Sequence, residues 1–330
     1  MRAGARLAAV LAAAALVPAA LCLQGCGTTP TIKLRLGVFP GEMSAPVAVA
    51  GEKGFFRSNG LEATVTRYDS GASAVKALLA GELDVATAAD YVFARGCFTG
   101  PDLRLLASIG RYDTNWFITK RQSGISKTAD LGGRSVGTPQ GTVAEYLLGS
   151  SLTREGLALH DVRVVYLAPG ELQEALRSGS VDAVVVSDPY AYDIKKTLGG
   201  EAVSWSAQGG QDVFWTLISR ESILKGRPGM SERLMRAMIG AEGFIKEHPD
   251  EAKRIVSRLY GLGMPYLDIA WPRNRFEVSL DQALLFTLDM QARWYKESGL
   301  AGASALPDYL KLIDFTGLER ADPDAVEMVR

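Results

Sequence analysis

Apolar residues recur along this chain in two alternating patterns, and the alternation predicts an α/β fold. Short apolar runs typical of buried strands are separated by stretches in which apolar residues return every three or four positions, as they do on one face of a helix. In the first third of the chain, strands are predicted at 32–39, 62–68 and 85–88, and helices at 46–56 and 72–80. Strands separated by helices of this length pair in parallel with right-handed crossovers.

The pattern changes in the middle of the chain and then repeats. Residues 103–109 and 115–119 form two strand-like runs with no helix between them. A second series follows, with strands at 135–137, 162–167 and 183–186 and helices at 142–154, 171–177 and 190–198. After a strand at 214–219, helical spacing dominates from Ser222 onward. We therefore expect two α/β lobes joined by two crossing strands, followed by a helical C-terminal segment.

The changes of pattern also give the expected domain boundaries. Lobe one is predicted to comprise residues 33–112 and 222–330, and lobe two residues 120–212. The hinge strands that connect the lobes are predicted at 113–119 and 213–221.

The N-terminus has the layout of a secretory signal. Arg2 and Arg6 precede an apolar run over 7–21, which leads into Leu23-Gln24-Gly25-Cys26. An uncleaved membrane anchor is the alternative, but the run is shorter than the roughly 20 residues that span a bilayer, and Pro18 interrupts it. A secreted protein without an anchor is a further alternative.

A cysteine directly after a small residue resembles the bacterial lipobox, and this resemblance implies diacylglyceryl attachment to Cys26. We accordingly expect a lipoprotein signal peptide at 1–25 and a lipidated linker at 26–32. The protein is then expected outside the cytoplasm, in the periplasm or at the cell surface, tethered to a membrane. Cys97 would be the only other thiol of the mature chain, and a free cysteine of this kind is usually buried.

Composition and charge exclude several function classes. The 330 residues carry a formal net charge of −1, which gives no indication of nucleic-acid binding. Only two histidines occur, His160 and His248, and neither has other metal-ligating residues at the required spacing. No phosphate-binding loop or ordered catalytic triad is present. We expect no cofactor and no metal.

A series of short motifs occurs in a characteristic order between residues 33 and 250. The motifs are Leu36-Gly37-Val38, Ser44-Ala45-Pro46, 50–56, 60–63, 71–78, 81–85, 131–137, Val181-Asp182-Ala183 and Asp188-Pro189-Tyr190. Together they resemble the nitrate/sulfonate/taurine substrate-binding protein family, which also includes binders of thiamine-precursor pyrimidines. The resemblance implies a type II periplasmic-binding fold, in which two α/β lobes close on a ligand.

Ligands of open α/β sheets collect beyond the carboxyl ends of the strands, where helix N-termini leave N–H groups free. Five predicted loops, at 41–46, 70–73, 88–90, 138–142 and 188–190, fit this description. The candidate ligand-binding residues in these loops are Ser44, Ser70, Gly71, Ser73, Asp90, Thr138, Gln140, Gly141, Thr142, Asp188 and Tyr190. The serine, threonine and aspartate residues could instead be simple helix caps.

Two tryptophans and three cations complete the candidates. Trp116 and Trp215 lie in the predicted crossing strands, where they could cover an apolar part of a ligand, with core packing as the alternative. Arg95, Arg111 and Lys120 could face an anionic ligand, or could simply be solvated.

These features predict the solute-binding component of an ABC importer. We expect a monomer that captures a small anionic or zwitterionic ligand, such as a sulfonate, nitrate or taurine, and delivers it to a membrane permease. Helix N-termini favour an oxyanion, whereas Glu42, Asp90 and Asp188 would suit a pyrimidine or another amine-bearing solute.

Two other functions stay open. One is a ligand-binding sensory protein that signals to a partner receptor. The other is an enzyme similar to the thiamine-pyrimidine synthases, which consume an active-site histidine. Because neither His160 nor His248 lies in a predicted cleft loop, we expect no catalysis.

Overall fold

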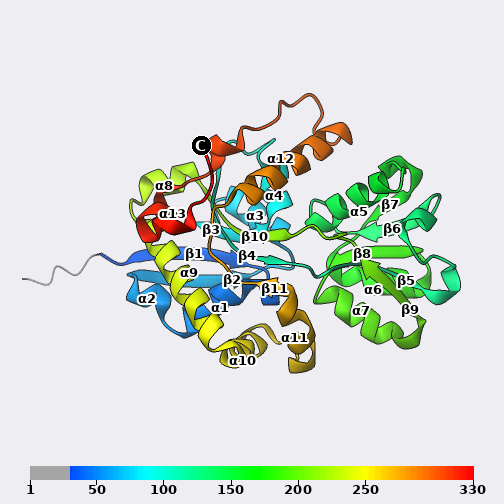
Figure 1. The fold of residues 1–330 in the computed structure, drawn as a ribbon, viewed down its shortest axis with the longest axis horizontal. Helices are drawn as coiled ribbons and strands as arrows, with labels where there is room; N and C mark the ends of the chain where they lie inside the picture. Colours follow the sequence, from blue (N-terminus) through cyan, green and yellow to red (C-terminus); the bar gives the residue numbers. More distant parts are fainter. Residues whose placement is uncertain (1–29) are drawn as a thin grey trace, which may run out of the picture. The chain divides into compact units, whose positions relative to one another are not determined.

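The computed structural model describes residues 30–330, and two mixed β-sheets form its framework (Figure 1). The first sheet has six strands in the order β11-β4-β10-β3-β1-β2. Its strands are β1 (Ile32–Val38), β2 (Leu61–Arg67), β3 (Val85–Ala89), β4 (Leu103–Tyr112), β10 (Val213–Arg220) and β11 (Asn274–Arg275). The predicted signal peptide and Cys26 lie outside the described residues.

The second sheet has five strands in the order β7-β6-β8-β5-β9. Its strands are β5 (Asn115–Lys120), β6 (Ser135–Thr138), β7 (Arg163–Tyr166), β8 (Ala183–Ser187) and β9 (Ala202–Ser206). In each sheet, parallel pairing around β1 or β6 gives way to an antiparallel strand inside the sheet, β10 in the first and β5 in the second. Strands β10 and β5 each follow directly after the chain has crossed from the other sheet. At the edge of the first sheet, β11 also pairs antiparallel, with β4.

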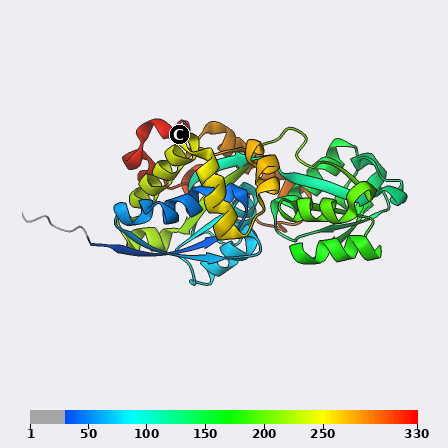
Figure 2. The same ribbon diagram turned by 90° about the horizontal axis from the view of Figure 1, so that it is seen from below.

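Helices link the parallel strands of both sheets. In the first lobe these are α1 (Ala45–Glu52), α2 (Phe55–Ser58), α3 (Gly71–Leu79) and α4 (Asp90–Gly96). In the second they are α5 (Val143–Arg154), α6 (Leu172–Ser178) and α7 (Tyr190–Leu198). The C-terminal helices gather on the first lobe (Figure 2). They are α8 (Glu221–Gly226), α9 (Met230–Glu247), α10 (Pro249–Tyr260), α11 (Met264–Ala270), α12 (Gln282–Glu297) and α13 (Thr316–Ala321).

Successive side chains of β5 pack into two different hydrophobic clusters. Phe117 and Ile118 are both fully buried, and they belong to different clusters of packed side chains. Successive side chains of a strand point to opposite faces of the sheet. Phe117 therefore packs in the larger cluster, which extends into the first lobe, whereas Ile118 packs against α6 and α7 residues such as Leu172 and Ile194.

The predicted fold class is confirmed: two α/β lobes, two connections and a helical C-terminal segment are present. One predicted helix is divided, because Gly54 adopts a left-handed conformation (φ 76°) and separates α1 from α2. The two-residue strand β11 was not predicted, because it lies in the region expected to be helical, and neither was β9. Strand β9 pairs only with β5, and its residues are partly exposed, so its sequence lacks the apolar run of a buried strand.

The chain passes between the sheets through two short segments, residues 113–114 and 207–212. Both strands expected at the crossing are thus members of a sheet, β5 of the second and β10 of the first. None of the helices within residues 30–330 combines the length and the apolar character that a membrane crossing requires.

Candidate functional site

A cleft lies between the two lobes at the carboxyl ends of their strands. One wall contains Phe39, Asp69 and Ala89, which end or closely follow β1, β2 and β3. The opposite wall contains residues that end or follow β6, β7 and β8, namely Pro139, Pro169 and Ser187. We call this region the inner cleft; the empty space among its lining residues, counted together with the open solvent at its mouth, is about 490 Å³. It lies where the general rule for open α/β sheets places a ligand.

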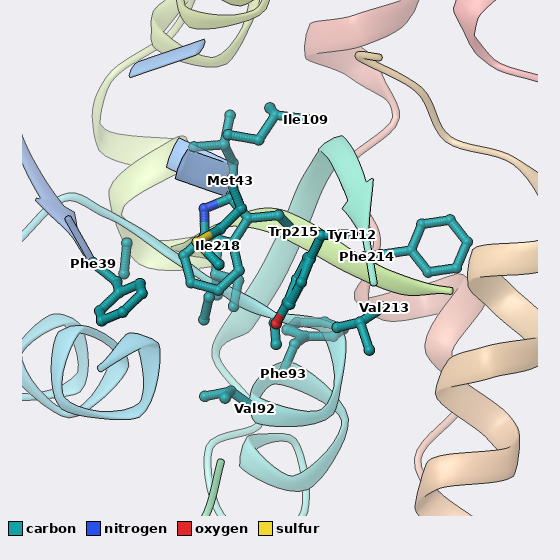
Figure 3. Close-up of a cluster of buried hydrophobic side chains, with 14 of the residues drawn as sticks. Phe39, Met43, Val92, Phe93, Ile109, Tyr112, Val213, Phe214, Trp215 and Ile218 are labelled. Carbon is teal, nitrogen blue, oxygen red and sulfur yellow. The ribbon is translucent and has the colours of Figure 1, made fainter. Parts of the chain in front are cut away.

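Aromatic and apolar side chains dominate the lining of the inner cleft. Five of them, Phe39, Met43, Val92, Tyr112 and Trp215, belong to the cluster of buried hydrophobic side chains drawn in Figure 3. The Trp215 ring lies edge-on to Phe39 and to Tyr112, with centroid separations of 6.2 and 6.0 Å. From the second lobe, Tyr190 approaches Phe39 at 6.1 Å. Its hydroxyl donates to the Asp69 carbonyl oxygen at 3.4 Å, so this hydrogen bond joins the two walls of the cleft.

Ser44 fixes the orientation of Trp215. Its hydroxyl accepts a hydrogen bond from Trp215 Nε1 at 3.0 Å and donates to the Phe39 carbonyl oxygen at 2.7 Å. Ser44 is fully buried, so it lies behind the ring that it holds. The polar edge of the indole is satisfied in this way, and its apolar face is left for the cleft.

The N-terminus of α3 reaches the cleft through Ser70 and Gly71. Ser70 Oγ accepts a hydrogen bond from Ser73 N at 3.1 Å and lies 3.0 Å from Ser73 Oγ, which is the geometry of a helix cap. Gly71 packs against β3, because an added Cβ would lie 2.7 Å from the Ala88 Cα.

The N-terminus of α5 faces the cleft from the second lobe. Thr142 occupies its N-cap position, but its hydroxyl donates to the Pro139 carbonyl oxygen at 2.9 Å and does not cap the helix. Gly141 N donates to Glu145 Oε2 at 2.9 Å. Gly141 has φ 71°, a left-handed conformation that favours glycine.

Asp90 connects three elements behind the cleft. Its carboxylate accepts hydrogen bonds from Tyr91 N, Phe214 N and Gln291 Nε2 at 2.7 to 3.0 Å. Complete burial raises the pKa of this carboxyl to about 6, against the lowering effect of these hydrogen bonds. Asp90 thus ties α4 to β10 and to α12.

The carboxylate of Asp188 has fewer hydrogen-bond partners than that of Asp90. One carboxylate oxygen accepts from Trp116 Nε1 at 3.4 Å, and the other has no partner within residues 30–330. Burial raises the pKa of Asp188 to about 7, with the Lys195 charge opposing this rise and Glu42 adding to it. Trp116 lies outside the inner cleft, with Lys195 Nζ 3.7 Å from its ring centroid.

The predicted ligand-binding residues thus fall into three groups. Those that line the inner cleft are Ser70, Gly71, Thr142, Tyr190 and Trp215. Ser73 and Gln140 line a wider outer cleft, which shares Ser70 and Thr142 with the inner one. The others do not line either region: Ser44, Asp90, Trp116, Thr138, Gly141 and Asp188.

Several apolar residues of the inner cleft were not predicted from the sequence. They include Phe39, Met43, Val92 and Tyr112. Phe39 directly follows β1 and Tyr112 ends β4, so an aromatic residue at a strand end was the available signal.

Two contacts join the lobes beside the cleft. On one side, Tyr146 of α5 stacks on Tyr91 at 5.4 Å and meets Trp294 of α12 edge-on at 5.3 Å. On the other side, Tyr192 of α7 lies 5.0 Å from Tyr266 of α11. The C-terminal helices α11 and α12 therefore contact the second lobe from both sides.

The model of the NMT1/THI5-like family matches residues 42–252. The chain belongs to this family. Among curated proteins, it is similar to a provisionally named binding protein of Brucella abortus, with 27% identity over 246 residues that cover 72% of this chain and 74% of the relative. It is also similar to a provisionally named aliphatic sulfonates-binding protein of Bacillus subtilis, with 25% identity over 265 residues that cover 75% and 77%. The family resemblance that the sequence motifs indicated is confirmed.

Solved structures agree on the fold. The alkanesulfonate-binding protein SsuA from Xanthomonas axonopodis pv. citri, bound to MOPS, has a TM-score of 0.75 and 18% identity, covering 87% of this chain and all of that one. The desulfurization enzyme DszB has a TM-score of 0.63 and 16% identity, covering 89% and 99%. The fold is confirmed, and it serves both a binding protein and an enzyme, so function must be argued from the site.

Proposed function

We propose that this protein is the solute-binding component of an ABC importer, which captures a small anionic or zwitterionic solute between its lobes and delivers it to a membrane permease. The observation that carries the proposal is a cleft built by both lobes at the carboxyl ends of their strands, with helix N-termini in its two walls. Free N–H groups and the helix dipole attract anions at such positions. The relatives named for sulfonate binding support the same class of solute.

The side chains of the inner cleft favour binding over catalysis. Within the described residues, its titratable side chains are Asp69, Tyr112 and Tyr190. Neither histidine lines it, and Cys97 is buried elsewhere with the pKa of its thiol raised by desolvation. The hydroxyl of Ser70 lies 3.3 Å from Asp69 Oδ1, but Ser70 Oγ also accepts from Ser73 N and so caps helix α3, which favours a structural role over that of a nucleophile. We therefore propose that the solute leaves the cleft unchanged.

Calorimetric titration of the purified protein with taurine, alkanesulfonates and nitrate tests this proposal. We expect at least one of these solutes to bind with a stoichiometry near one, and mass spectrometry of the recovered solute should show an unaltered molecule. Turnover of the solute to a product would show that the protein is an enzyme and would contradict the proposal.

We also propose that the protein is extracytoplasmic and anchored through an acyl group on Cys26, as the sequence motif at 23–26 indicates. Intact-mass analysis of the membrane fraction should show a chain that begins at acylated Cys26. The Cys26→Ala variant should lose that modification. An unmodified Cys26 in a chain that still begins at Met1 would refute the anchor and leave the solute-binding proposal unaffected.

A further inference from the structure

The lining of the inner cleft is suited to contact an apolar part of a solute. Phe39, Tyr112 and Trp215, which are 7%, 2% and 3% exposed, form an edge-to-face series on the first lobe (Figure 3). Tyr190 extends this series from the second lobe. None of the inner-cleft residues is a lysine or an arginine, and the one carboxylate, on Asp69, belongs to an exposed residue shared with the outer cleft. Nitrate has no apolar group to place against these rings, and taurine has only two methylene groups.

A cation lies next to this apolar surface, in the outer cleft. Arg95 of α4 lines the outer cleft together with Ser73, Gln140 and Thr142. Its guanidinium lies against the loop before α5, because an added Cβ on Gly141 would be 2.5 Å from Arg95 Nη1. Arg95 Nε is buried and has no hydrogen-bond partner within residues 30–330. A buried donor without a partner costs free energy, so a ligand acceptor at this point would be favoured.

The other two candidate cations have partners elsewhere. Arg111 pairs with Asp281 and Asp212 and lies over the Phe214 ring. Lys120 donates to the Arg177 carbonyl oxygen at 3.2 Å. The Glu145 carboxylate near Arg95 accepts from Gly141 N and from the Tyr91 hydroxyl. Arg95 Cζ also lies over a ring, 5.8 Å from the Tyr295 centroid, but among these three cations Arg95 is the one that lines the outer cleft and can meet a solute there.

We propose that the solute is an organic acid with a ring-sized apolar body, which packs against Phe39, Tyr112 and Trp215 while Arg95 binds its acidic group. This inference rests on the proposed function and narrows its solute class. The two regions of the cleft then act on different parts of one molecule. Burial of the body in the inner cleft supplies affinity, since apolar surface leaves water. Arg95 and the helix N-termini select for the acid.

Competing probes of matched charge test the apolar body. Naphthalene-2-sulfonate and cyclohexanesulfonate should bind at least tenfold more tightly than methanesulfonate and taurine in calorimetric titrations of the purified protein. Equal or tighter binding of the two short sulfonates would overturn this inference and leave the solute-binding function standing. If none of the four probes binds, both the inference and the proposed anionic solute class fail.

Variants test the role of Arg95. Arg95→Gln should weaken binding of naphthalene-2-sulfonate on the order of ten- to a hundredfold, the range expected for loss of a charged hydrogen bond. It should change the affinity for the uncharged naphthalene-2-sulfonamide by less than threefold. Arg95→Lys should restore part of the loss. Lys296→Gln is the matched control, because Lys296 is an exposed cation that lines neither the inner nor the outer cleft.

A structural role for Arg95 would give a different result. Equal weakening of the sulfonate and the sulfonamide by Arg95→Gln, or a loss as large in Lys296→Gln, would overturn the assignment of Arg95. Melting of each variant without solute shows whether it is folded. If Arg95→Gln does not fold, the Arg95→Lys variant carries the same comparison between charged and uncharged probes.

Discussion

The buried carboxylates of Asp90 and Asp188 differ in how many hydrogen bonds they accept. Asp90 satisfies three donors from three elements, and Asp188 leaves one oxygen without a partner in the described part of the chain. Both residues directly follow a strand in the sequence. At such a position the sequence alone does not distinguish a ligand-binding residue from a structural one. Their hydrogen bonds favour an anchoring role for Asp90, which makes its predicted ligand role directly testable.

Replacing Asp90 by alanine separates these two roles. The donors Tyr91 N, Phe214 N and Gln291 Nε2 would lose their acceptor, at about 1–3 kcal/mol for each unsatisfied group. We expect chemical denaturation of Asp90→Ala to show a free energy of unfolding lower by roughly 3 kcal/mol or more. The affinity of the remaining folded protein for its solute should change less than threefold. A hundredfold loss of affinity with unchanged stability would instead make Asp90 a ligand-binding residue.

Asp188 should make stability depend on pH. Its pKa is about 7 in the folded protein and 3.8 ordinarily, so between these values only the unfolded chain releases the proton. The free energy of unfolding should therefore fall as pH rises from about 4 to 7, by on the order of 4 kcal/mol from this group. Asp188→Asn should remove this decline and be the more stable protein above pH 7.

Denaturation curves of Asp188→Asn and the wild type from pH 4 to 8 measure this effect. Glu155→Gln is the control, because Glu155 is exposed. An unchanged pH dependence in Asp188→Asn would show that Asp188 is not the group responsible.

Residue type and position predicted which loops reach the cleft, but not where each side chain points. Ser70, Thr142, Tyr190 and Trp215 line the inner cleft, whereas Ser44 and Asp90 lie behind it. The difference depends on contacts with residues more than a hundred positions away, such as Trp215 for Ser44 and Gln291 for Asp90. Local sequence does not encode such partners.

Among the elements, α5 and α12 make an unusually close contact between the lobes. Gly149 of α5 lies against Trp294 of α12, and an added Cβ would come within 2.1 Å of the indole ring. This glycine lets the two helices approach while Tyr146 packs on the same tryptophan. The contact therefore depends on a residue without a side chain.

We expect Gly149→Ala to force α5 and α12 apart. Overpacking typically costs about 1–3 kcal/mol, and here it would act on the contact between the lobes. Both the melting temperature and the solute affinity should fall. The matched control is Gly243→Ala in α9, where an added Cβ meets nothing within 4 Å and should stabilise the helix by about 0.5–1 kcal/mol. Equal behaviour of the two variants would argue against a tight interlobe contact.

Element prediction succeeded where the apolar pattern was strong and failed where it was weak. The fully buried strand β3 and the cleanly capped helix α3 were evident in the sequence. The partly exposed strand β9 is recognisable only through its pairing with β5. The division of α1 from α2 depends on the conformation of a single glycine, Gly54.

At the scale of the whole molecule, Gln208 forms hydrogen bonds with both connections between the lobes. Its side-chain oxygen accepts from Asn115 N and Nδ2, and its amide donates to the Tyr112 and Gln211 carbonyl oxygens. One side chain thus links the outgoing connection to the returning one. The predicted lobe ranges, 33–112 with 222–330 and 120–212, stay a prediction until motion about these connections is measured.

The distance between the lobes, measured with and without solute, tests the central claim most directly. Spin labels at Thr99→Cys and Glu171→Cys would face each other across the outer cleft, since both exposed residues line it from opposite lobes. A single-label Thr99→Cys protein controls for labelling of Cys97. With the sulfonate that binds most tightly in calorimetry, we predict a shorter and narrower distance distribution, which removal of the solute by dialysis reverses. An identical distribution with and without saturating solute would contradict capture of the solute by closure of the two lobes.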